Sequence, residues 1–183
     1  MKKILLLFLL FTAGCASWNQ IGRSSALTSY NFSIEFPDHW TKLNTHKYLI
    51  YTKDNPLSQY ILAQQRHVDK PFRNTKKKIK KGMLPQEAAE VIVDEITSDR
   101  SVLNFRVVES FPARVNSYDG FKIAFTYKNE NGLKFNTIYY GFLQGEWFYS
   151  VRYNADERHY SEEDIRAFGE ALSSFTIMDA GPV

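Results

Sequence analysis

The chain has 183 residues, with 23 Lys and Arg against 20 Asp and Glu, and a formal net charge of +3. Lys2 and Lys3 belong to a leader that we expect to be removed, which leaves 21 basic residues against 20 acidic ones. A charge so close to zero gives no reason to expect nucleic acid as a partner. The single cysteine excludes an intramolecular disulfide, so the hydrophobic core must stabilise the fold.

The chain begins MKKILLLFLLFTAGCAS, which is the pattern of a secretion signal. Two lysines precede an apolar run from Ile4 to Phe11. Such a run is too short to cross a bilayer, since a spanning helix needs about 20 residues. Small residues then lead into Cys15. An ordinary cleavage site does not require a cysteine directly after it, so Cys15 is the distinguishing feature.

Thr12, Ala13, Gly14 and Cys15 together resemble the lipobox of bacterial lipoproteins, in which a small residue precedes a cysteine that becomes lipidated. The resemblance implies cleavage between Gly14 and Cys15 and attachment of diacylglycerol and a fatty acid such as palmitate to Cys15. The lipid chains would then anchor the protein to a membrane of the cell envelope. In a cell with two membranes, Ala16 favours the outer membrane, facing the periplasm. The alternative is a secreted protein with a free Cys15.

The predicted organisation has three parts. Residues 1–14 are the signal peptide, residues 15–29 are the lipidated cysteine and a polar, flexible tether, and residues 30–183 are a single globular domain. As a flexible coil, the tether reaches on the order of 20 Å. The domain is therefore expected to lie close to the membrane surface.

Alternating apolar and polar residues dominate the domain and predict β-strands. In the segment YNFSIEFP, for example, Tyr30, Phe32, Ile34 and Phe36 alternate with polar residues. Short turns between successive strands favour an antiparallel meander. In the last strand, alternation predicts that Trp147, Tyr149, Val151 and Tyr153 face one side and Phe148 the other. The predicted strands cover residues 30–37, 47–54, 58–68, 105–115, 120–128, 133–143 and 146–155.

Two segments have helical rather than strand periodicity. Residues 85–99 place Ala88, Ile92 and Ile96 at four-residue steps, and residues 161–175 begin with Ser161, which is suited to cap a helix. Both helices are amphipathic and need a sheet to cover. The predicted fold class is therefore α+β, an antiparallel sheet flanked by helices.

The order of these landmarks resembles the PsbP-like α/β/α sandwich, over roughly residues 30–177. That group includes the photosystem II extrinsic protein, a Ran-binding nuclear transport factor and many uncharacterised bacterial lipoproteins. The resemblance implies a binding or accessory role without a shared active site, and it is an analogy of fold. It rests on Phe36, Pro37 and Trp40, on Asp119 and Gly120, on Tyr153 to Ala155, and on Ser174 and Phe175.

The sequence contains no recognised catalytic or nucleotide-binding motif. Glu87, Glu90, Asp94 and Glu95 are interpreted as the solvated face of a helix rather than a calcium site. We therefore predict no catalytic residue, no metal and no cofactor. The histidines are isolated from one another in sequence, are expected at the surface or in loops, and are His39, His46, His67 and His159.

A lysine-rich segment, RNTKKKIKKG at residues 73–82, has two interpretations. Its lysines would contact an anionic lipid surface, or they would form a solvated loop balanced by the acidic helix that follows. Basic residues beside a membrane contribute about 1 kcal/mol each at an anionic surface. The lysines are Lys76, Lys77, Lys78, Lys80 and Lys81.

The sequence thus favours a lipid-anchored, non-catalytic binding or accessory lipoprotein of the bacterial envelope. Its partners would be the membrane, through Cys15, and an envelope protein. The alternatives are an envelope hydrolase with a dispersed site that uses His67 or His159, and a structural protein that binds anionic lipid. Most of the aromatic residues are expected in the core, and a few are candidates to line a ligand groove.

Overall fold

The computed structural model describes residues 30–43, 45 and 48–178, and the signal peptide, Cys15 and the tether lie outside these residues. The described residues form two helices and nine strands. In chain order they are β1 (Phe32–Ser33), β2 (Thr41–Leu43), β3 (Leu49–Thr52), β4 (Gln59–His67), α1 (Pro85–Thr97), β5 (Leu103–Val115), β6 (Tyr118–Lys128), β7 (Lys134–Gln144), β8 (Trp147–Asp156), α2 (Glu162–Ser174) and β9 (Thr176–Ile177).

One antiparallel sheet organises the molecule, with the strand order β2-β3-β4-β8-β7-β6-β5. Strands β5 to β8 form the predicted meander, closed between β7 and β8 by a tight turn in which Gly145 has a φ of 61°. The meander prediction is wrong at one point, because β4 pairs with β8 and not with β5. After β4 the chain forms α1 and then re-enters the sheet as β5, the edge strand on the other side of β8, β7 and β6. Helix α1 can therefore cover strands that lie between β4 and β5.

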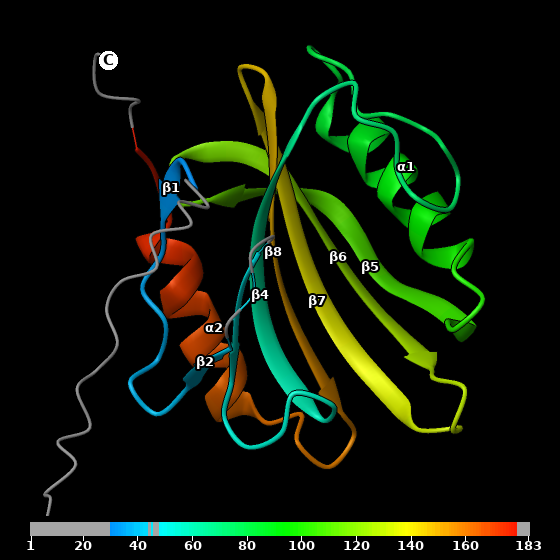
Figure 1. The fold of residues 1–183 in the computed structure, drawn as a ribbon, viewed down its shortest axis with the longest axis vertical. Coiled ribbons are helices and arrows are strands. Elements are labelled where there is room, and N and C mark those ends of the chain that lie inside the picture. The colour runs from blue at the N-terminus through cyan, green and yellow to red at the C-terminus, as the bar shows by residue number, and fades with distance from the viewer. Residues whose placement is uncertain (1–29, 44, 46–47, 179–183) are drawn as a thin grey trace, which may run out of the picture.

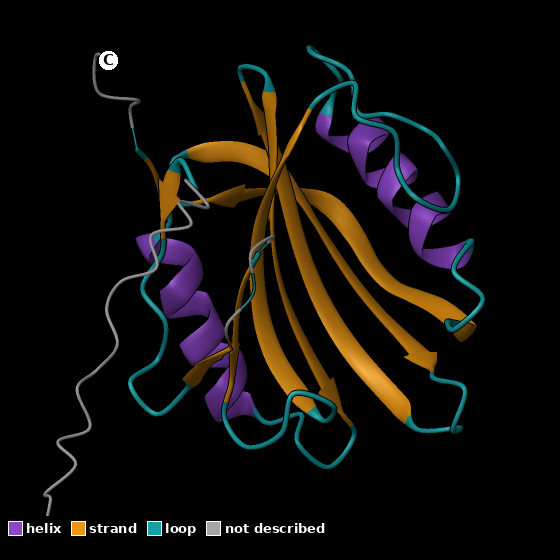
Figure 2. Cartoon of the chain, in the orientation of Figure 1, coloured by secondary structure: helices purple, strands orange, loops and turns teal. Residues whose placement is uncertain are grey.

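The two helices lie on opposite sides of the sheet (Figures 1 and 2). Helix α1 contacts β5, β6 and β7, whereas α2 contacts β8 on the other side. A small second sheet, β1 with β9, lies beside α2. The predicted class, α+β with an antiparallel sheet flanked by helices, is confirmed.

Each helix begins where its sequence provides a cap. At the start of α1, the Glu87 carboxylate accepts a hydrogen bond from the Leu84 N–H at 2.9 Å, and Pro85 occupies the first turn, where no N–H donor is needed. At the start of α2, the Ser161 hydroxyl accepts a hydrogen bond from the Asp164 N–H at 3.2 Å. The predicted helices are confirmed with slightly shorter bounds.

Alternation along β8 divides the core into two parts. Tyr149, Val151 and Tyr153 pack with Phe168 in the core under α2, whereas Phe148 belongs to the core under α1. This is the division that the sequence predicted. The remaining side chains on the α1 side of β8 are polar, and they lead to the candidate site.

The first predicted strand is much shorter than expected. Residues 30–37 keep the alternation of burial, but only Phe32 and Ser33 pair with another strand, β9. Asn31 instead uses its N–H to bind the side chain of Gln65 at 2.9 Å, so this segment is held partly by side chains. The short strands β2 and β9 were not predicted, because segments of two or three residues carry no periodic signal.

Candidate functional site

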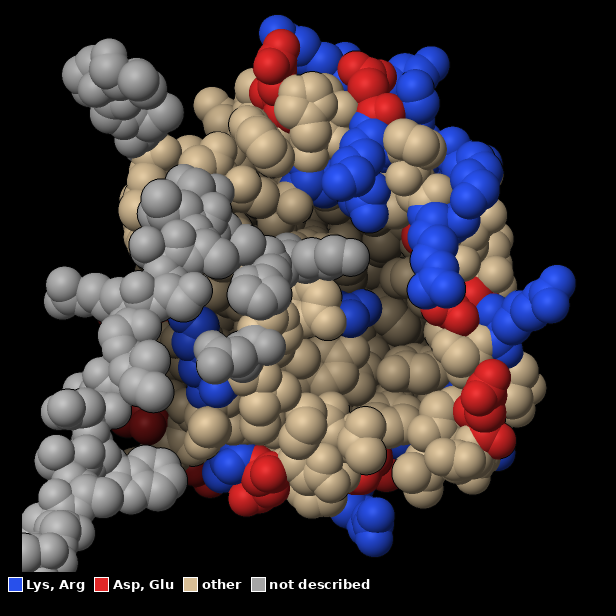
Figure 3. All heavy atoms as spheres, in the orientation of Figure 1, with Lys and Arg blue, Asp and Glu red and all other residues tan. Residues whose placement is uncertain are grey.

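Helix α1 covers only part of its side of the sheet. Its contacts fall on β5, β6 and β7, and in the described part of the chain no helix lies over β4 on that side (Figure 1). Figure 3 shows that this face is hollowed, with Lys and Arg side chains gathered along the edge next to the lysine-rich segment. We call this region the tyrosine hollow, which comprises Tyr60, Leu62, Gln64, Tyr127, Tyr139 and Arg152.

Arg152 lies at the centre of the tyrosine hollow. In the sheet register it stands between Leu62 of β4 and Tyr139 of β7. Its guanidinium carbon is 5.3 Å from the centroid of the Tyr60 ring, which is a cation–π contact. Its Nε is buried and has no hydrogen-bond partner, and among the described residues no ion pair reaches the guanidinium.

Among the described residues, no carboxylate forms an ion pair with Arg152, and the groups that act on its pKa are tyrosines. Burial lowers the pKa of Arg152, but Tyr60, Tyr139, Tyr127 and Tyr48 outweigh burial and raise it. Tyrosines act in this way only when ionised. Burial raises the pKa of both Tyr127 and Tyr139 to about 12, so these two rings are neutral at pH 7. At that pH the guanidinium is therefore charged, and the described residues supply no counter-charge to it.

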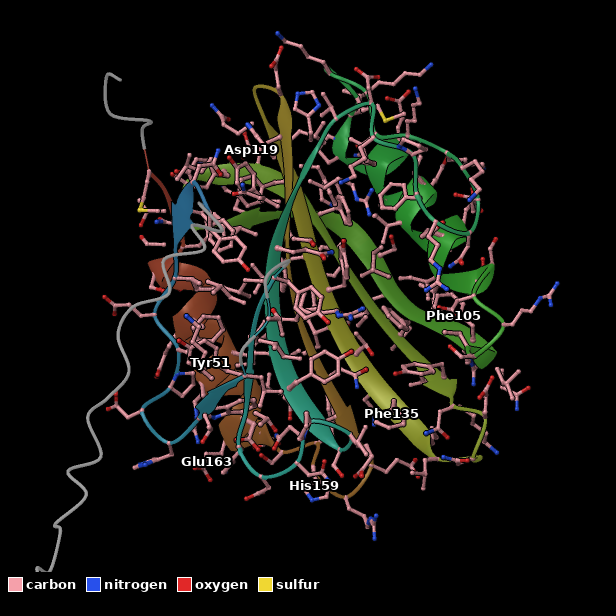
Figure 4. The ribbon with its side chains drawn as sticks, viewed as in Figure 1. Tyr51, Phe105, Asp119, Phe135, His159 and Glu163 are labelled. Atoms are coloured by element: carbon pink, nitrogen blue, oxygen red, sulfur yellow. The ribbon has the colours of Figure 1, made fainter. Side chains whose placement is uncertain are left out.

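Polar groups next to Arg152 on this face of the sheet are joined to one another by hydrogen bonds. The Asn154 side-chain oxygen accepts from the Thr137 hydroxyl at 2.7 Å and from the Tyr127 hydroxyl at 3.2 Å. The Tyr127 ring in turn stacks on Phe135, labelled in Figure 4, with centroids 5.3 Å apart. These contacts fix the wall of the tyrosine hollow, and none of them uses the Arg152 guanidinium.

A second concavity of 440 Å³ lies between α1 and β5. Val93, Val107, Phe111 and Pro112 line it, and Glu90 and Asp94 lie at its rim. Strand β5 is an edge of the sheet and exposes Val107, Val108 and Phe111. Its lining mixes apolar side chains with polar ones, and among the described residues none of these polar groups is both buried and without a hydrogen-bond partner. The tyrosine hollow is therefore the better candidate for specific binding.

The lysine-rich segment is held against α1. Lys77 forms an ion pair with Asp94, Glu95 accepts hydrogen bonds from the backbone of Asn74 and Thr75, and Ile79 is buried in the α1 core. The acidic helix thus balances part of the loop, as one interpretation expected. The five lysines are all exposed, and their contact with an anionic surface stays a prediction: Lys76, Lys77, Lys78, Lys80 and Lys81.

The histidines are dispersed. His159 follows β8 at one end of the sheet, where its Nδ1 lies 2.8 Å from a buried carboxylate oxygen of Asp156 (Figure 4). His67 ends β4, with its Nε2 3.7 Å from Glu146. His39 is exposed, and His46 lies outside the described residues. Among the described residues, no three His, Cys, Asp or Glu side chains lie together in a way that would hold a metal ion.

Sequence reasoning did not single out Arg152. The signal was present in β8, where Ser150, Arg152 and Asn154 alternate with large apolar residues in a strand at the centre of the sheet. An antiparallel strand can pack one face on the core and leave the other face uncovered, and its residues then alternate between apolar and polar. Polar residues on one face therefore indicate a face that is not filled by a helix.

Comparison with known proteins places the fold. No known family and no curated protein matches the sequence. Solved structures do match, among them LpqN, described as involved in cell envelope biogenesis of Mycobacterium tuberculosis, with a TM-score of 0.57 and 13% identity over 80% of this chain and 83% of LpqN. Cyanobacterial PsbP from Synechocystis sp. PCC 6803 matches with a TM-score of 0.56 and 7% identity, over 89% of this chain and 98% of that protein. The chain has the PsbP-like fold.

A third solved structure has a similar fold. A variant of Mog1 matches with a TM-score of 0.53 and 9% identity, over 82% of this chain and 92% of Mog1. Identities this low establish the fold and leave the function to be argued from the site. Neither described helix is both long and apolar enough to cross a bilayer.

Proposed function

We propose that this chain is a lipid-anchored, non-catalytic binding protein of a bacterial cell envelope, and that the tyrosine hollow is its binding site. The observation that carries the proposal is the half-covered face of the sheet, where a charged side chain meets aromatic rings. Apolar walls with a few well-placed polar groups are typical of sites for small organic molecules. The location is supported by the lipobox-like segment ending at Cys15 and by the similarity of fold to LpqN, which is described as involved in cell envelope biogenesis.

The anchor is tested by fractionation and mass spectrometry. Wild-type chain expressed in a bacterium is expected in the membrane fraction, with a mature N-terminus at a diacylated Cys15. The Cys15→Ser variant cannot be lipidated and is expected to lose membrane attachment. An unmodified leader, or a mature chain that starts at another residue, would contradict the anchor.

The binding site is tested by photo-crosslinking in living cells. A photoreactive phenylalanine replaces Tyr60 in the tyrosine hollow, and the matched control carries it at Leu57, which is 79% exposed and lies in the turn just before β4. We expect a discrete small-molecule adduct at position 60 and none at position 57. Equal labelling at both positions, or no adduct at position 60, would remove the hollow as a binding site.

A further inference from the structure

The charge on Arg152 is the one feature of the tyrosine hollow that its surroundings leave unbalanced. The buried carboxylates of the described chain are paired: Asp164 with Lys53 at 3.1 Å, and Asp156 with His159 at 2.8 Å. In the same part of the chain, the one interaction found for the Arg152 guanidinium is its cation–π contact with the Tyr60 ring. An uncompensated charge removed from water is costly, so a group that supplies the missing negative charge from outside would bind favourably there.

We infer that the tyrosine hollow binds an organic oxyanion, a carboxylate or a phosphate, through the guanidinium of Arg152. This inference rests on the proposed function of the hollow and names its ligand class. The guanidinium presents its N–H donors in a planar fork that matches the two oxygens of a carboxylate or phosphate. No side chain of the described chain occupies that fork.

The other residues of the tyrosine hollow indicate which kind of group should be attached to the anion. Tyr60 is half-buried and offers its ring, Leu62 adds an apolar surface beside Arg152, and Gln64 adds an amide one step along the same face of β4. Rings of this kind favour a flat or apolar group attached to the anion. The lysine-rich segment along the edge of the hollow adds positive potential that attracts anions (Figure 3).

The binding test uses the full-length chain in a non-ionic detergent and two simple anionic probes, benzoate and phenyl phosphate, with benzamide as the neutral isostere of benzoate. Binding is followed by NMR through the Nε–Hε resonance of Arg152. We expect a saturable shift with at least one anion and none with benzamide. Benzoate alone would indicate a carboxylate ligand, and phenyl phosphate alone a phosphate ligand.

Two variants separate the charge of Arg152 from its shape. Arg152→Met removes the charge and is expected to abolish saturable binding. Arg152→Lys keeps the charge without the fork and is expected to weaken binding by about tenfold. Because the variants lack the arginine resonance, their binding is read from the backbone amides of β4. The inference would be overturned if benzamide bound as tightly as benzoate, or if Arg152→Met bound the anions as well as wild type does. It would also be overturned if neither anion gave saturable binding.

The melting temperature separates a ligand-binding arginine from one that stabilises the fold, because the two cases predict shifts in opposite directions. Without ligand, Arg152→Met is expected to raise the melting temperature by roughly 2 °C or more, because it removes an unpaired charge. The matched control is Arg66→Met, in β4, on the same face of the sheet as Arg152. The Arg66 guanidinium lies 4.4 Å from the Phe72 centroid and donates a hydrogen bond to the Pro71 carbonyl at 3.3 Å, so its loss should lower the melting temperature. A fall for Arg152→Met would assign Arg152 to the core and contradict the inference.

The two proposals fail separately. An adduct at position 60 in cells, together with no response to either anion, would keep the hollow as a binding site and exclude an oxyanion as its ligand. No adduct at position 60, with saturable anion binding in vitro, would keep the chemistry of Arg152 and reject the hollow as the site used in the cell.

Discussion

Gly141, at the centre of the sheet, gives the sharpest test of the packing described here. It lies on β7 opposite Phe121 of β6, and a Cβ added to it would lie 2.6 Å from Cζ of Phe121 and 2.8 Å from Cζ of Phe148. These two rings are stacked with centroids 6.2 Å apart and are 1% and 2% exposed. The glycine is thus the position at which the tips of two buried rings meet the backbone.

The cost of Gly141→Ala follows from these distances. Carbon atoms pack at about 3.5–4.0 Å, so each ring must retreat by roughly 1 Å. Both rings lie in the core under α1, and overpacking of this kind costs about 1–3 kcal/mol. At about 2–4 °C per kcal/mol for a domain of this size, we expect a fall in melting temperature of about 2–12 °C.

The matched control is Gly169→Ala in α2. A Cβ at Gly169 meets no atom within 4 Å, and alanine is favoured over glycine in a helix by about 1 kcal/mol, so the melting temperature should rise by about 2–4 °C. Thermal and urea unfolding followed by circular dichroism measure both variants, with equal urea m-values as the check on a common unfolding reaction. A Gly141→Ala variant as stable as wild type would refute the packing of the two rings.

Two further predictions concern charged groups. Burial by itself raises the pKa of Asp164, but hydrogen bonds from Ser161, Gln59 and Lys53 outweigh it and hold that pKa below its ordinary value. A lowered pKa stabilises the fold above the unfolded value and loses this contribution as the pH falls through the folded pKa. Acid unfolding of Asp164→Asn should therefore show a weaker loss of stability below about pH 4 than wild type, and identical acid limbs would contradict this. Replacing the five lysines of residues 76–81 with glutamine should reduce sedimentation with anionic vesicles, at about 1 kcal/mol per lysine, with the melting temperature nearly unchanged because the Lys77–Asp94 pair is exposed. Unchanged sedimentation would exclude the loop as a lipid contact.

The fold could be predicted largely from local patterns. Alternation located the long strands and assigned Phe148 and Tyr149 to opposite faces, and the helices were marked by Pro85 and Ser161. The position of β4 next to β8 could not be predicted in this way. That pairing depends on where α1 packs, and the sequence pattern of α1 shows that it has an apolar face without showing which strands lie beneath it.

The candidate site could be predicted only in part. Aromatic residues of the β7–β8 hairpin were expected mainly in the core, and Tyr149 and Tyr153 are there. Tyr139 is also buried, but it stands beside Arg152, and this neighbourhood arises from the register of three strands. A lone arginine in one strand reveals neither the missing carboxylate nor the rings that surround it, because Tyr60 and Tyr127 come from distant parts of the chain.

The most direct test of the proposed lipid anchor and of anion binding by Arg152 is native mass spectrometry of the chain extracted from bacterial envelopes in detergent. We expect a chain that begins at Cys15 and carries its lipid. It should also retain a non-covalent acidic molecule that is lost in Arg152→Met and kept in Arg66→Met. Identical spectra for wild type and Arg152→Met, with no bound acid in either, would contradict it.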